Sequence, residues 1–198
     1  AGVIDLDNDY NGVDARWNWQ TELAGRPFEL TVGGNFDNQT QLRRGFENYV
    51  GSDVGVRGRL RRHESNRVRN IDEFAQAWWQ FAPRWAVLAG VRHSEVEFRS
   101  RDRYIVPPNP DDSGSVTHSD TTPVAGLMFS PTDELRLYLS AGRGFETPTF
   151  NELSYRADGA PGLALYLEPA VSRNYELGMK WRAPAGASIE AALFRADT

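Results

Sequence analysis

The sequence predicts an all-β fold, a segment of an antiparallel, up-and-down transmembrane β-barrel with about eight strands. Two observations support this prediction. Apolar and polar residues alternate with a period of two in separate stretches, which is typical of strands with one apolar and one polar face. Short turns and long polar connections join these stretches in alternation, as in barrels whose long loops all lie on one side of a membrane.

The clearest alternation lies in two stretches of the C-terminal third. In 135–141 every odd position is Leu or Ala, and in 174–181 the odd positions are all large and apolar or aromatic. In the stretch that begins at Trp85 the phase drifts at Val96 and Phe98, where we expect the chain to leave the membrane. Strands are predicted at 13–23, 28–37, 70–81, 85–98, 121–129, 135–142, 172–181 and 188–195.

The connections between these strands fall into two classes. The short turns each contain Gly or Pro and span 24–27, 82–84, 130–134 and 182–187. The long polar connections are predicted as loops at 38–69, 99–120 and 143–171. Loops of this length are unusual in a compact soluble domain and normal on the extracellular side of a barrel. Residues 1–12 are predicted as a further solvated acidic loop.

Composition excludes several classes of protein. The formal net charge is −5, so nucleic acid is not expected as a partner, because phosphate binding needs a basic surface. The absence of cysteine excludes disulfides and Cys-ligated metals. No run of about 20 apolar residues predicts a transmembrane helix. The chain opens without a signal peptide and stops inside a strand pattern, so we expect both ends to be cut.

No catalytic or metal-binding motif is found. Nucleophile-elbow, zinc-protease and Walker patterns are all absent, and the three histidines are predicted to be solvated. Asp5, Asp7 and Asp9 have the spacing of a calcium loop, but Tyr10 and Arg16 replace the Gly and Glu that such a loop needs. The chain is therefore predicted to be neither an enzyme nor a holder of a metal or cofactor.

The two faces of the predicted sheet differ in chemistry. The polar face carries mixed charges, including Arg16, Glu29, Arg92 and Glu176, which suits a wet lumen. The apolar face carries aromatic residues, several of them beside the short turns, where a membrane-interface girdle is expected. The predicted girdle residues are Trp17, Trp19, Trp79, Phe81, Trp85, Phe129 and Trp181.

One region of the chain resembles the barrel of TonB-dependent outer-membrane receptors. A strand ending in Gly-Arg-Gly-Phe-Glu-Thr-Pro is followed by a long loop, then by Leu-Glu-Pro and by Asn-Tyr-Glu-Leu-Gly, which opens the next strand. The order, spacing and strand phase of these segments carry the resemblance over about fifty residues. The residues concerned are Gly144, Phe145, Pro148, Asn151, Glu152, Leu153, Glu168, Pro169, Tyr175, Glu176 and Gly178.

The resemblance implies a barrel of about 22 strands with a plugged lumen, in the outer membrane of a Gram-negative bacterium. Residues 1–198 are then expected to be a partial β-barrel domain, without the plug domain and the remaining strands. The implied function is energy-dependent uptake of a scarce nutrient such as a ferric siderophore, with haem, cobalamin and a quinone cofactor as other ligands known in the family. The implied partners are this ligand, TonB, the plug and outer-membrane lipid.

Ligand-binding groups are expected on the long loops. Guanidinium groups pair well with carboxylates, so loop arginines are candidates for an anionic ligand. The candidates are Arg43, Arg44, Arg61, Arg62, Tyr155 and Arg156. Two alternatives stay open at this stage: a small outer-membrane barrel enzyme, which would need a catalytic set near one rim, and a soluble all-β binding module, which would bury its aromatic face.

Overall fold

The computed structural model describes residues 2–153, 156–157, 162–183 and 186–198. Within these residues, eight long strands form one antiparallel sheet in the order β1-β2-β5-β6-β7-β8-β9-β10. Their bounds are β1 Gly2–Leu23, β2 Arg26–Glu47, β5 Leu60–Ala82, β6 Trp85–Asp102, β7 Gly114–Phe129, β8 Leu135–Glu146, β9 Ala170–Arg182 and β10 Ser188–Asp197. The smaller elements are β3 Tyr49–Val50, β4 Asp53–Val54 and helix α1 Phe150–Leu153.

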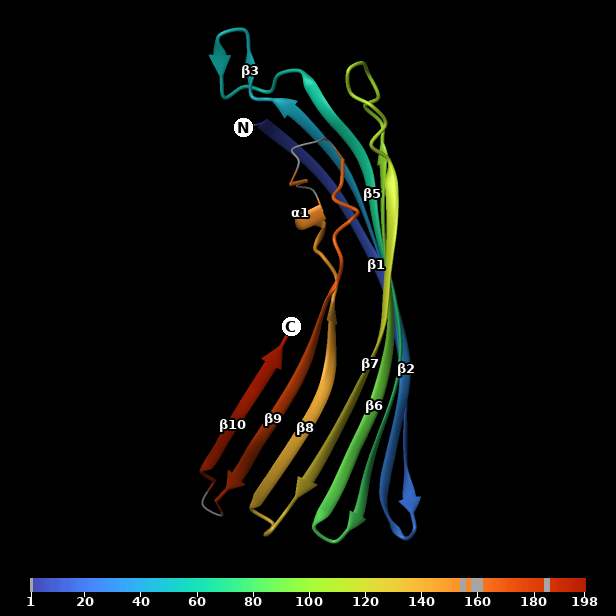
Figure 1. Cartoon of the computed structure of the whole chain (residues 1–198), viewed down its shortest axis with the longest axis vertical. Helices are drawn as coiled ribbons and strands as arrows, with labels where there is room; N and C mark the ends of the chain where they lie inside the picture. The colour runs from blue at the N-terminus through green and yellow to red at the C-terminus, as the bar shows by residue number, and fades with distance from the viewer. Residues whose placement is uncertain (1, 154–155, 158–161, 184–185) are drawn as a thin grey trace.

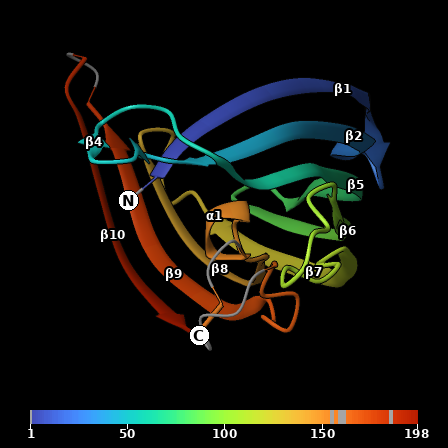
Figure 2. The same ribbon diagram turned by 90° about the horizontal axis from the view of Figure 1, so that it is seen from above.

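The long strands follow one another up and down, and each pairs with its neighbour in sequence. The sheet curves into an open wall with a concave and a convex side (Figure 1). Seen from above, the strands trace an arc, and α1 lies inside it (Figure 2). No helix among the described residues is both long and apolar enough to span a membrane. The eight-strand, up-and-down prediction is confirmed.

Cross-strand register assigns each side chain to a face, because directly paired residues point the same way. Trp19 pairs with Leu30, and Phe28 pairs with Trp79, so the apolar residues of successive strands form one continuous surface. This surface is widely exposed; Trp17, for example, is 71% exposed. The other face carries the polar positions, and it is the concave one, since it contacts the segment that contains α1.

Two predicted loops are wrong, because the strands are longer than the alternation suggests. Residues 1–12 belong almost entirely to β1, and most of 38–69 belongs to β2 and β5. Only 48–59 connects these two strands, and it contains the β3-β4 hairpin. The backbone ladder continues above the apolar belt, where the convex face no longer meets hydrocarbon and no strict alternation of side chains is required.

The remaining connections agree better with the sequence. The turn at Ala24 and Gly25 has positive φ angles of 54° and 69°, which fits a two-residue hairpin between β1 and β2. The second long loop is shorter than predicted, because β6 ends at Asp102 and β7 begins at Gly114. The third is nearly as predicted, since β8 ends at Glu146 and β9 begins at Ala170.

The sheet opens between β7 and β8. These strands pair only over Val124–Phe129 and 137–142, although β7 starts ten residues earlier, at Gly114. The long β8-β9 connection enters the concave side above the point where the pairing stops (Figure 1). This connection positions the candidate site.

Candidate functional site

Helix α1 is held by a reciprocal cap at its N-terminus. The Thr149 backbone N–H and hydroxyl both donate to Glu152 Oε2, at 2.7 and 2.8 Å, and the Glu152 N–H donates to Thr149 Oγ1 at 3.3 Å. This is a capping box, which satisfies N–H groups that a helix start leaves unpaired. The hydrogen bonds to Thr149 lower the pKa of the Glu152 carboxyl, so the cap is ionised at neutral pH. A one-turn helix is thereby stabilised locally.

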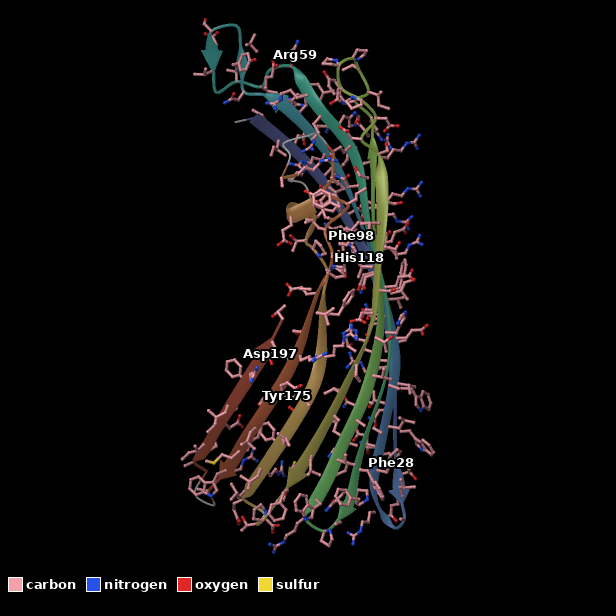
Figure 3. The ribbon with its side chains drawn as sticks, in the orientation of Figure 1. Phe28, Arg59, Phe98, His118, Tyr175 and Asp197 are labelled. Carbon is pink, nitrogen blue, oxygen red and sulfur yellow. The ribbon has the colours of Figure 1, made fainter. Side chains whose placement is uncertain are left out.

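The β8-β9 connection is anchored to the wall by apolar packing. Leu153 is fully buried, and Leu163 and Phe98 are 4% and 3% exposed in the same cluster. Phe98 lies on β6 beside His118 of β7, with ring centroids 6.3 Å apart (Figure 3). The partly buried residues that complete the cluster are Val68, Val96, Val116, Phe150, Leu165 and Leu167. The connection therefore lies over the concave faces of β5, β6 and β7.

A charged contact adds to this anchor. Asp112, in the β6-β7 connection, packs against Gly162, so that a Cβ added at Gly162 would lie 3.1 Å from the Asp112 Cβ. Burial raises the pKa of the Asp112 carboxyl, and Asp102 raises it further. Arg62 and Arg156 act in the opposite direction. Two arginine and three aspartate side chains, with Asp111 as the third aspartate, thus meet where the connections converge on the concave side.

A pocket of about 280 Å³ opens on the concave face, with Phe145 of β8 at its edge. Asp72, on β5, is 2% exposed; it accepts hydrogen bonds from Arg92 Nη2 at 2.6 Å and from Asn70 Nδ2 at 2.7 Å. Arg143 reaches the same pocket and lies 3.0 Å from Asp120. The pocket thus offers two guanidinium groups, each already beside a carboxylate.

A second polar cluster lies higher on the same wall. Asn66 is 2% exposed and accepts a hydrogen bond from Ser100 Oγ at 2.7 Å. Glu64, 4% exposed, lies 2.5 Å from Arg62 Nε. These side chains are held in place by one another, so the concave wall presents ordered polar groups. A larger hollow, of about 620 Å³, lies at the opposite end beside the short turns and is lined by Trp78 and Arg136.

The predicted ligand-binding residues are not gathered in one place. Arg43 and Arg62 lie on the concave face of β2 and β5, so placing them in a loop was wrong. Arg44 points to the other face, where its Nη2 lies 3.2 Å from Asp5. Arg61 is exposed on β5, which also corrects its loop placement. Arg156 lies near Asp112, as its effect on that carboxyl indicates, and Tyr155 is outside the described residues.

The predicted girdle residues share one face of the sheet. Trp85 stacks on Phe129 with ring centroids 4.4 Å apart. The ring centroids of Trp79 and Phe81 lie 6.0 Å apart. Register places the other members on the same convex face; they are Trp17, Trp19 and Trp181. Except for Trp17, all lie within a few residues of a short turn.

The motif residues of β8 and β9 have clear packing roles. The Tyr138 ring covers Gly178, so that any side chain there would collide with it, and the Tyr138 hydroxyl donates to Glu176 at 2.5 Å. Gly144 allows Ser172 to approach in the same way. Tyr175 is 47% exposed on the convex face.

The other motif residues belong to the connection between β8 and β9. Pro148 and Pro169 are partly buried at its two ends, and Glu168 is exposed. Asn151 lies in α1, but its side chain is outside the described part of the structure.

Sequence reasoning missed the apolar anchor of the site. Val96, Phe98 and Val116 face the concave side, against the alternation that predicts polar residues there. The phase drift at Val96 and Phe98 was the signal. It reflects burial under the β8-β9 connection.

Comparison with known proteins identifies the family. A family model described as "TonB dependent receptor-like, beta-barrel" matches residues 1–198, the whole chain. The chain belongs to this family. This receptor segment is therefore part of an outer-membrane β-barrel of a Gram-negative bacterium, and its family comprises transporters and not enzymes, as the sequence predicts.

Two relatives of this chain have names that give different ligands. A "Vitamin B12 transporter BtuB" of Photobacterium profundum is 36% identical over 69 residues, which are 35% of this chain and 11% of that protein. A "Transferrin-binding protein A" of Neisseria meningitidis is 33% identical over 115 residues, 56% of this chain and 11% of the other. The receptor segment thus aligns with only a small part of each relative.

The fold is shared with solved receptors. The siderophore receptor PiuA of Acinetobacter baumannii superposes with a TM-score of 0.76 at 15% identity, over 96% of this chain and 32% of that one. The segment thus spans about a third of a receptor of this fold. Among the described residues, no group of His, Asp or Glu side chains could hold a metal ion.

Proposed function

We propose that the protein is an energy-coupled uptake receptor that imports a small, scarce nutrient such as a ferric siderophore. In this proposal residues 1–198 form about eight strands of a barrel of about 22, and a plug domain encoded outside this segment fills the concave side. TonB supplies the energy through the full-length chain. The observation that supports the proposal is the continuous polar concave wall, over which a loop from the long-connection end is folded inward.

The aromatic residues of the convex face form, in this proposal, the girdle that contacts outer-membrane lipid on the side of the short turns. Trp85, stacked on Phe129, and Trp79 lie where β5, β6 and β7 meet those turns. Ring systems with a polar edge prefer the membrane interface. In this proposal, the apolar convex side chains that lie between these rings and the upper parts of the strands contact the hydrocarbon core of the membrane.

The positive charge of three arginines supports an anionic iron chelate as the ligand in this proposal. Arg43, Arg62 and Arg156 come from β2, β5 and the β8-β9 connection and lie toward the concave side at the loop end. Guanidinium groups bind carboxylate and catecholate-type oxygen anions through directed hydrogen bonds.

Uptake by the full-length receptor tests the transport proposal. Cells that carry the receptor as their only route should accumulate radiolabelled iron from a carboxylate or catecholate siderophore, and a strain without TonB should not. Equal uptake with and without TonB would contradict an energy-coupled receptor. Import of labelled cobalamin in place of ferric chelates would keep the transporter and reject the ligand class.

A pair of matched variants tests the role of the arginines. Arg62→Ala and Arg156→Ala together should weaken siderophore binding to the purified receptor by about tenfold or more, because each charge-assisted hydrogen bond contributes roughly 1.5–3 kcal/mol. Arg16→Ala, on the same face but in the half of β1 that leads to the short turn, should leave the affinity unchanged. Equal affinity of all three proteins would remove the arginines from the ligand site.

A further inference from the structure

The convex face of β5 and β6 brings two like charges directly opposite each other. Arg67 of β5 pairs in register with Arg99 of β6. Like charges in this position destabilise a sheet unless an anion lies between them. Arg99 makes no ion pair or hydrogen bond within the described residues, and the nearest carboxylate along its face of β6, Glu97, lies opposite Arg69.

Further arginines extend this pair into a patch. Arg69 lies two residues along β5, and Arg101 lies two residues along β6 opposite Ser65. We call Arg67, Arg69, Arg99 and Arg101 the outer basic patch. Side chains with nitrogen ends project from the convex side of the upper sheet, away from α1 (Figure 3).

The hydrogen bonds of the patch leave its outer nitrogens available. Arg67 Nε donates to Asn38 Oδ1 at 2.6 Å, and Asn38 is 8% exposed beneath it, so the guanidinium is oriented by its inner edge. Arg69 Nη1 lies 3.9 Å from Glu97, a long contact for an ion pair. Arg101 lowers the pKa of the Asp111 carboxyl, after the larger effect of hydrogen bonds from Ser113. Positive charge therefore exceeds negative charge in the patch.

The position of the patch relative to the apolar belt suggests its partner. Trp79 and Trp85 mark the short-turn end of the convex face, and a transmembrane strand needs about 9–11 residues to cross. Counted from these two residues, the crossing ends at 69–71 on β5 and at 93–95 on β6. The outer basic patch thus continues the lipid-facing surface into the zone of the lipid headgroups on the loop side.

We propose that the outer basic patch binds the phosphate groups of an anionic glycolipid in the outer leaflet. The acyl chains of this lipid lie along the apolar convex belt, and its phosphates bridge Arg67 and Arg99. Guanidinium groups bind phosphate bidentately, and the bridge removes the repulsion between the paired arginines. The proposal does not depend on which nutrient is imported, because the patch and the concave site lie on opposite faces.

Native mass spectrometry of the full-length receptor in detergent micelles, titrated with lipid A, tests this proposal. The variant Arg67→Gln/Arg99→Gln should bind lipid A about tenfold more weakly or worse, because charge-assisted hydrogen bonds are lost. Arg16→Gln/Arg136→Gln removes the same charge from the concave face, and its affinity should stay within about twofold of the wild type.

Two further arms identify the ligand. Dephosphorylated lipid A should bind the wild type and the patch variant with the same weak affinity. Millimolar inorganic phosphate should not displace lipid A from the wild type. The proposal is wrong if the patch variant retains lipid A as well as the wild type, or if the dephosphorylated lipid binds equally well. Displacement by inorganic phosphate would also reject it, since the patch would then be a free-anion site. Each variant is folded if heating changes its mobility in gel electrophoresis by the same amount as it changes that of the wild type.

Discussion

Leu153, the last residue of α1, and Phe98 of β6 are buried in one apolar cluster, although they come from segments that no strand pairing connects. This contact turns the β8-β9 connection from an outward loop into a cover over the concave face. The described part of the connection is held on β5, β6 and β7 by packing, because it pairs with none of these strands.

Leu153→Ala should release the connection. Removing a fully buried leucine side chain costs about 2–5 kcal/mol, and here that cost falls on the anchor. Hydrogen exchange of 162–167 should accelerate strongly, while the exchange of paired β5 and β6 amides stays unchanged. Leu139→Ala, on the convex face, is the control. Unchanged exchange of 162–167 in the Leu153 variant would show that the cluster does not hold the connection.

Glu152→Ala should have a similar but smaller effect. Loss of one partner of a capping box costs about 0.5–2 kcal/mol, and Glu152→Gln should recover part of it. The same exchange measurement should rank the variants with Leu153→Ala most open, then Glu152→Ala, then Glu152→Gln. A Glu152→Ala protein as open as the Leu153 variant would contradict the assignment of the main anchor to apolar packing.

The packing of Asp112 predicts a pH dependence. Because burial raises the pKa of this carboxyl in the folded state, the protonated form is favoured there, and the stabilisation is complete only below the ordinary carboxyl pKa of about 4. The connection should therefore loosen as pH rises from that value through the raised pKa of Asp112. Exchange of 162–167, corrected for intrinsic rates, should show this step.

Asp112→Asn separates this effect from other carboxyls nearby, including Asp102 and Asp111. The variant should remove the step, and Asp133→Asn, in a short turn, should leave it in place. A step that survives in Asp112→Asn would assign the titration to another group.

Arg92→Leu should destabilise the wall, because it leaves the Asp72 carboxylate buried without its ion-pair partner. Arg92 is itself half exposed, so we expect a loss of about 1–3 kcal/mol in urea unfolding, below the cost for a fully buried pair. The double variant Arg92→Leu/Asp72→Asn should recover part of the loss. Additive losses would show that the two side chains do not act as a pair.

The membrane-level part of the fold follows directly from the sequence. Between Trp79 and Ile71, and between Leu135 and Ala141, lipid on one side and a wet lumen on the other impose alternation, so strand, face and turn are all readable. Above this level the convex face no longer meets hydrocarbon, and the pattern disappears although pairing continues, as at Arg43 with Glu64. That is why the strand extensions were predicted as loops.

The candidate site was less predictable for a different reason. Its apolar anchor joins Phe98 to Leu153 and Leu163 across a long separation, and no local period records such a contact. The motif residues were recognisable from the sequence. The contacts that Glu152, Glu176 and Gly178 make became visible only in the folded arrangement of β8, β9 and their connection. Arg62 and Arg156 were named as candidates from residue type alone, and the structure places only some members of that set on the concave side.

The central claim is that alternate positions of each strand face lipid and lumen, with the odd positions of β8 facing lipid. Spin labelling along β8 tests it most directly. Residues 1–198 contain no cysteine, so a single cysteine at 137, 138, 139 or 140 is the only thiol in this part of the receptor, and the receptor without it is the control for labelling elsewhere. In vesicles containing the full-length receptor, labels at 137 and 139 should be relaxed by lipid-soluble oxygen. Labels at 138 and 140 should be relaxed by a water-soluble nickel complex or shielded by the plug. Equal oxygen accessibility at all four positions would contradict the assignment of the two faces.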